Sequence, residues 1–118
     1  MFNFLRSAAP ATPLAEVIAA VQAGTTTLID VRDISEVKAT GRAAGALHIP
    51  LMRVSMMCDP RHPDFVAGLH ADKPVAIYCA SGARSGMAAG MLRKLGFADV
   101  TNIGGFGNWV QAGGAVTR

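Results

Sequence analysis

The sequence is poor in cysteine, and its N-terminus has no long apolar run. Two of the 118 residues are cysteine, Cys58 and Cys79. They are too few for a disulfide framework and lack the paired spacing of a zinc site, so we expect reduced thiols, a cytoplasmic protein and no metal or other cofactor. In residues 1–7 the positive Arg6 follows a very short apolar piece, which predicts neither a signal peptide nor a membrane span.

Charged and aromatic residues are also scarce. Charged residues make up 16% of the chain and aromatic residues 6%, and the net charge of +3 comes from 11 basic and 8 acidic residues. The basic residues are scattered and do not alternate with aromatic ones, which predicts that neither nucleic acid nor a membrane is a partner. A slightly positive surface still favours encounters with small anions.

Hydrophobic residues, at 51%, are abundant enough for a real core, and the length fits one domain over residues 1–118 with a core at about 13–116. Strand-like and helical segments alternate. We expect helices at Thr12 (cap) to Gly24, 35–40, 64–69, 85–95 and around Trp109, strands at 25–31, 46–49, 75–78 and 99–103, and irregular chain at 51–63. This order predicts an α/β fold with a central, mostly parallel β-sheet flanked by helices on both faces.

Cys79 stands where an apolar strand meets a helix. Four small residues, written ASGA, separate it from Arg84. The carboxyl end of a strand that feeds a helix gathers unpaired backbone N–H groups, and the helix N-terminus is partly positive. Small side chains let the loop curl with these groups inward, and Gly82 accepts positive φ. The pattern therefore predicts a thiolate nucleophile at Cys79, although a lone cysteine is often only a buried core residue.

The segment YCASGARS, at 78–85, resembles the active-site loop of single-domain rhodanese-like sulfurtransferases. Further resemblances to that family are LIDVR at 28–32, GALHIP at 45–50, and Gly104-Gly105 followed by Trp109. The resemblance covers roughly residues 13–116. Where the family often has glycine-histidine-isoleucine, this chain has GRAA at 41–44.

The resemblance implies transfer of a sulfane sulfur through a persulfide on the catalytic Cys79. The donor would be a small anion such as thiosulfate, or a persulfide, and the acceptor cyanide or a thiol, with a protein acceptor left open. Arg84 would hold the loop and attract the donor. The substrate-binding residues would be Ala80, Ser81, Gly82, Ala83, Arg84 and Ser85.

Two other functions remain open. One is a persulfide carrier or partner-binding module without turnover, because a fold does not fix a function. The other is a cysteine-based phosphatase or arsenate reductase, whose loop has five residues between cysteine and arginine. The four residues of this chain make a tighter ring, which suits one sulfur atom better than a phosphate.

The remaining polar residues have structural interpretations. Asp30 and Arg32 could be catalytic, but at the end of a buried strand they more often form an ion pair that fixes neighbouring loops. Cys58 is either a resolving thiol for Cys79 or an ordinary loop cysteine. His48 is expected to be packed and hydrogen-bonded.

Trp109 is expected to anchor the core, and Arg53 and Arg61 to be exposed charges. His62 and His70 have no ligand partners in the sequence, which argues against a metal site. Three methionines, Met52, Met56 and Met57, could form a soft surface for a partner or fill gaps in the core.

Overall fold

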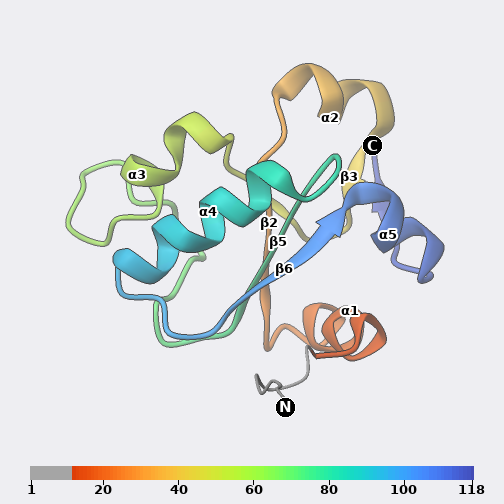
Figure 1. Cartoon of the computed structure of the whole chain (residues 1–118), viewed down its shortest axis with the longest axis horizontal. Coiled ribbons are helices and arrows are strands. Elements are labelled where there is room, and N and C mark those ends of the chain that lie inside the picture. The colour runs from red at the N-terminus through yellow and green to blue at the C-terminus, as the bar shows by residue number, and fades with distance from the viewer. Residues whose placement is uncertain (1–11) are drawn as a thin grey trace, which may run out of the picture.

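A computed structural model describes residues 12–118, so the expectation for residues 1–7 lies outside the described chain. Its central sheet has four parallel strands in the order β4-β2-β5-β6 (Figure 1). These strands are β2 (Thr27–Asp30), β4 (Leu47–His48), β5 (Val75–Cys79) and β6 (Val100–Gly105). The main helices are α1 (Leu14–Gln22), α2 (Ile34–Thr40), α4 (Ala83–Lys94) and α5 (Phe106–Gln111). The predicted α/β fold with a mostly parallel sheet is confirmed.

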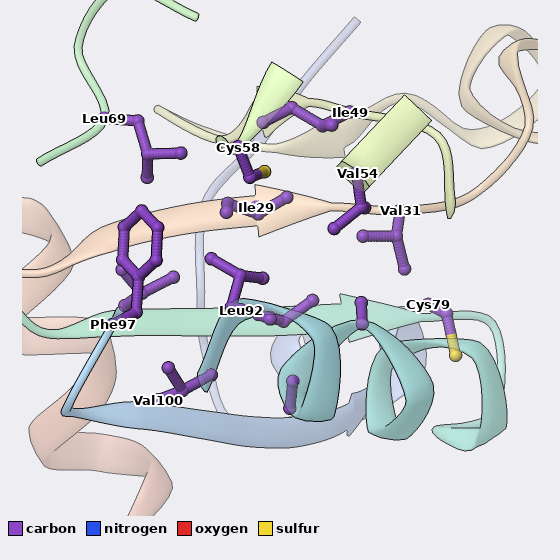
Figure 2. Packing of buried hydrophobic residues seen from close by; sticks show 14 residues of the cluster. Ile29, Val31, Ile49, Val54, Cys58, Leu69, Cys79, Leu92, Phe97 and Val100 are labelled. Carbon is purple, nitrogen blue, oxygen red and sulfur yellow. The ribbon is translucent and has the colours of Figure 1, made fainter. Parts of the chain in front are cut away.

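Side chains of β5 alternate between two buried clusters, one on each face of the sheet. Val75, Ile77 and Cys79 join the cluster that packs against α4, drawn in Figure 2. Ala76 and Tyr78 join the other cluster, which includes residues of α1 and α5. In Figure 1, α4 accordingly lies on one side of the sheet and α1 and α5 on the other. Burial on both faces explains why β5 is continuously apolar in sequence.

The first helix begins differently from the prediction. Pro13, not Thr12, is the N-cap, and its carbonyl accepts the N–H groups of Glu16 and Val17. The expected cap at Thr12 is therefore wrong by one position. Gly24 has φ +79°, a left-handed conformation that lets the chain leave the helix as predicted.

Two segments between β4 and β5 also differ from the prediction. Residues 51–63, expected to be irregular, contain a 3-10 turn η1 (Leu51–Arg53) and a short helix α3 (Val54–Met57). Val54 is fully buried there, so tertiary packing orders a segment without clear periodicity. Residues 64–69, expected to be helical, form only turns, and Gly68 with φ +92° interrupts any helix.

A small antiparallel pair joins β3 (Arg42–Ala43) to β7 (Val116–Thr117). Neither strand was predicted, because two-residue strands carry no alternation. Gly41 precedes the pair with φ +78°, and a Cβ there would meet the Thr117 carbonyl at 2.6 Å. The C-terminal segment is thereby held beside the end of α2.

A buried polar network ties the end of β2 to β5. Arg32 binds Asp30 at 2.7 Å, and both side chains are almost completely inaccessible. The Tyr78 hydroxyl donates to Asp30 at 2.6 Å and accepts the N–H of Ala43 at 2.9 Å. Arg32 also stacks over the Phe106 ring at 4.4 Å. The structure thus places Asp30 and Arg32 in the structural ion pair that was expected of them.

Replacing Tyr78 with phenylalanine should destabilise the fold. The change leaves the buried Ala43 N–H without a partner and removes one donor from the Asp30 carboxylate, which keeps Arg32, at a cost of about 1–3 kcal/mol of unfolding free energy. Urea unfolding followed by the fluorescence of the single tryptophan, Trp109, measures it. Thr25→Val, which removes an exposed hydroxyl bond, is the control and should change stability by less than about 0.5 kcal/mol. Equal effects would contradict the role of the network.

Candidate active site

Cys79 is the last residue of β5 and is completely buried. The loop of Ala80, Ser81 and Gly82 turns directly into α4, so the sulfur lies at the helix N-terminus, as Figure 2 shows. Ala80 and Ser81 are exposed and form the outer wall of the loop. Cys79 therefore lies at the predicted strand-to-helix junction, covered by the loop, and its role as the nucleophile stays a prediction.

Hydrogen-bond donors converge on the Cys79 sulfur. The N–H of Gly82 lies 2.9 Å from Sγ and the Ser85 hydroxyl 3.3 Å. Burial raises the pKa of this thiol, but the Ser85 hydroxyl and the backbone amides of Ser85, Gly82 and Ser81 outweigh burial and lower the pKa to about 7. A thiol with this pKa is partly ionised at neutral pH, which agrees with the thiolate that the sequence predicts at Cys79.

Three glycines make the loop geometrically possible. Gly82 has φ +108°, which directs its amide toward the sulfur at the start of α4. On the neighbouring strand, Gly104 has φ +93°, and a Cβ on Gly105 would collide with the Ala80 carbonyl oxygen. The Gly104-Gly105 pair therefore lets β6 approach the loop after Cys79 closely.

Arg84 points toward α2 rather than over the sulfur. Its guanidinium forms a two-pronged pair with the Glu36 carboxylate, at 2.7 and 2.9 Å. Hydrogen bonds from Arg84 and from the Asp33 N–H lower the pKa of Glu36 to about 2, and the same pair raises the pKa of Arg84. Arg84 thus joins the first turn of α4 to α2, while its attraction for an anionic donor stays a prediction.

Two residues of the site were not found from the sequence. Glu36 follows Asp33 at the spacing of a helix capping box, but its pairing with Arg84, 48 positions away, has no local signal. Asn102 is a polar residue within β6, and its side chain reaches Ser85 and Gly82 across the loop. The only feature of the sequence that singles out Asn102 is that it is a polar residue inside a short, partly buried strand.

Cys58 lies in the core and not beside Cys79. In Figure 2 it is near Ile29, and Val54 and Val31 are drawn between it and Cys79. It is fully buried, and burial raises its pKa to about 12. This environment agrees with an ordinary packed cysteine and not with a resolving thiol.

The other residues fall into structural roles. His48 donates from Nε2 to the Arg32 carbonyl at 2.6 Å, and Trp109 is buried and donates to the Ala115 carbonyl at 2.7 Å. Met57 packs against the core, whereas Met52 is 90% exposed. Arg53 and Arg61 are exposed, as predicted.

A cavity of about 220 Å³ lies at the amino-terminal ends of the strands, whereas Cys79 lies at the carboxyl end of β5. It is bordered by α1 and the starts of β5 and β6, with Glu16 and Asp99 in its lining. As far as residues 12–118 show, neither cysteine lines it. The converging donors around Cys79, and not this cavity, therefore mark the candidate site.

Within residues 12–118, His, Cys, Asp and Glu side chains do not cluster in threes as a metal site requires. In the same part of the chain, every helix is too short or too polar to cross a membrane.

Comparison with known families gives a match to the rhodanese-like domain over residues 13–112. This chain belongs to the rhodanese-like domain family. A sulfurtransferase of Allochromatium vinosum is 33% identical over 73% of either chain. The uncharacterized protein YqhL of Bacillus subtilis is 39% identical over 70% of this chain, which spans 59% of that relative's length.

Solved structures agree with this assignment. The human single-domain sulfurtransferase TSTD1 has a TM-score of 0.73 and 25% identity, covering 88% of this chain and 97% of its own. A Rhodopseudomonas palustris protein of unknown function, described as a possible tyrosine phosphatase, has a TM-score of 0.77 and 32% identity, covering 88% of this rhodanese-like chain and 81% of its own.

The rate of alkylation of Cys79 by iodoacetamide should rise with pH, with a midpoint near 7. The thiolate is the reacting form, so the rate falls as the pH drops through the pKa and levels off above it. Peptide mapping by mass spectrometry measures the labelling. Cys79→Ser is the control and should remain unlabelled, because Cys58 is buried and protonated. A midpoint at the ordinary thiol value of about 8.5 would contradict the donor set.

Proposed function

We propose that the protein is a sulfurtransferase that accepts a sulfane sulfur on Cys79 and passes it to a thiophilic acceptor. The observation that supports this most directly is the set of donors around a buried sulfur with a lowered pKa. Thiosulfate or a persulfide is the proposed donor, and cyanide or a thiol the proposed acceptor. Membership of the rhodanese-like family agrees with this chemistry.

The first step loads the enzyme. The Cys79 thiolate attacks the outer sulfur of thiosulfate, a new S–S bond forms, and the old one breaks, so that sulfite leaves with the bonding electron pair. The product is a Cys79 persulfide anion, and the total charge is unchanged. We expect the backbone N–H groups of Ser81, Gly82 and Ser85, which act on Sγ, to stabilise the terminal sulfur as an oxyanion hole stabilises oxygen.

The second step regenerates the thiolate. Cyanide or an acceptor thiolate attacks the terminal sulfur and forms a bond to it. The S–S bond to Cys79 breaks, and its electron pair stays on Sγ. The product is thiocyanate or a new persulfide, and no external oxidant or reductant is needed.

Access to the sulfur requires the loop to open. Cys79 is 0% exposed, whereas Ala80 and Ser81 in front of it are exposed. A three-residue loop on the surface can open locally without unfolding the sheet beneath it. We infer that donor binding accompanies such an opening, after which the loop amides close around the persulfide.

A phosphatase or arsenate reductase is supported less well. The relative described as a possible tyrosine phosphatase keeps this alternative relevant. However, only four residues separate Cys79 from Arg84, which gives a small ring. A phosphate would need a wider loop. A persulfide carrier would differ from the proposed enzyme only in the acceptor that takes the sulfur. An assay with defined acceptors distinguishes the two.

Incubation with thiosulfate should increase the mass of the intact protein by one sulfur atom, located on Cys79. Intact-protein mass spectrometry before and after addition of cyanide measures loading and release. Cys79→Ser should abolish both, and Cys58→Ser, the matched control, should retain both because Cys58 lies in the core. Hydrolysis of an aryl phosphate without sulfur loading would favour the phosphatase, and loading without release to cyanide or dithiothreitol would favour the carrier.

Arg84→Ala should raise the KM for thiosulfate by about tenfold, the scale of one charge-assisted hydrogen bond. It should lower stability by less than about 1 kcal/mol, because the pair with Glu36 is about one-third exposed. Steady-state kinetics and urea unfolding measure the two effects. Glu36→Gln is the control, since it weakens the pair but keeps the cation. If it raises the KM equally, Arg84 positions the loop instead of attracting the donor.

A further inference from the structure

Asn102 has an amide whose orientation is fixed by its neighbours. It lies on β6 at the point where the pairing with β5 shifts, so that Ile77 faces Asn102 while Tyr78 faces Gly104. Its Nδ2 donates to the Gly82 carbonyl at 3.0 Å, and its Oδ1 accepts the Gly104 N–H at 2.9 Å. A flipped amide would place oxygen against the Gly82 carbonyl oxygen and an NH₂ group against the Gly104 N–H. Oδ1 is therefore the atom that faces Ser85.

The Ser85 hydroxyl has one hydrogen but three acceptors within reach, of which the Gly104 carbonyl, at 3.5 Å, is the most distant. Its Oγ lies 2.7 Å from Asn102 Oδ1 and 3.3 Å from Cys79 Sγ. Asn102 Oδ1 carries no hydrogen, so a contact of 2.7 Å requires that Ser85 donates to it. The contact with the sulfur is then made by the Cys79 S–H group donating to Ser85 Oγ. This arrangement is the one open to the protonated thiol, whereas the thiolate takes the Ser85 hydrogen for itself across the same 3.3 Å contact.

Ionisation changes the direction of this chain of hydrogen bonds. When the Cys79 proton leaves to bulk water, the thiolate is an acceptor only, and the Ser85 hydroxyl must rotate its hydrogen from Asn102 to the sulfur. Asn102 keeps its bond from Gly104 but loses the one from Ser85. The thiolate gains a donor at the expense of a short neutral hydrogen bond.

We propose that Asn102 is a positioning residue that holds the Ser85 hydrogen away from Cys79 until the thiol ionises. Asn102 thereby competes with the sulfur for its side-chain donor and keeps more of Cys79 protonated than the donors alone would. The inference deepens the proposed sulfur transfer, because it concerns the same nucleophile. The test measures the ionisation of Cys79 and needs no sulfur donor. Failure of this inference can therefore be distinguished from failure of the proposed sulfur transfer.

The charged groups near the sulfur do not explain this competition. Arg84 on α4 interacts with Cys79, and Glu36 and Asp33 at the start of α2 lie behind Arg84. Among the described residues that β6 brings to Ser85, Asn102 and Gly104 are uncharged. Asn102 can therefore act on the sulfur through the Ser85 hydroxyl or through its bond to the Gly82 carbonyl, and removal of the Ser85 hydroxyl should abolish only the first effect.

The test is a pH titration of the thiolate absorbance in the far ultraviolet, on the reduced full chain. Asn102→Leu removes the acceptor while keeping a side chain of similar size. We expect the pKa of Cys79 to fall by about half a unit or more, the scale of one neutral hydrogen bond. Ser85→Ala alone should raise this pKa. In the Ser85→Ala background, Asn102→Leu should not lower it.

The double variant also separates competition from loosening of the loop. Loss of the bond from Asn102 to the Gly82 carbonyl would change the pKa of Cys79 both with and without the Ser85 hydroxyl. Competition for the Ser85 hydrogen changes this pKa only when the hydroxyl is present. If Asn102→Leu does not fold, Asn102→Ala should show the same Ser85-dependent decrease, but smaller, because water can replace the amide. A shift that is zero, upward or equal in both backgrounds would overturn the proposal.

Discussion

Burial of a negative sulfur is the constraint on which the site depends. Cys58 and Cys79 are both fully buried, yet the pKa of one rises to about 12 and that of the other falls to about 7. Neither side chain is exposed, but Cys58 is the more deeply buried of the two, and burial alone raises its pKa. At Cys79 the donors of the loop and the first turn of α4 outweigh burial, while Cys58 lies among apolar side chains.

The rest of the fold holds those donors in place. Tyr78 and Cys79 are consecutive, so they face opposite sides of the sheet, and the bond from Tyr78 to the buried Asp30 anchors the strand immediately before the nucleophile. On the other side of the loop, Arg84 fastens α4 to α2 through Glu36. The loop from Cys79 to Arg84 is thus fixed at both ends by ion pairs or hydrogen bonds to charged groups that do not touch the sulfur.

The sequence predicted what local patterns encode. The strand before Cys79, the small-residue loop and the helix after it follow from burial on both faces and from turn chemistry, which neighbouring residues determine. Contacts across the fold had no such signal. Glu36 meets Arg84 only after α2 and α4 are placed side by side, and Asn102 reaches Ser85 because the β5–β6 register shifts there. The short helix α3 was missed because packing of Val54, not periodicity, orders it.

Gly105 lies on β6, a strand without a reactive group, yet it limits the size of the loop around the Cys79 sulfur. Its missing side chain is what allows the Ala80 carbonyl to sit against β6. An insertion that widened the ring around the sulfur would push this carbonyl outward, and any larger residue at position 105 would push it too. Loop length and strand end are therefore expected to vary together in evolution, so that a change of substrate on this scaffold involves compensating substitutions in two segments about 25 residues apart.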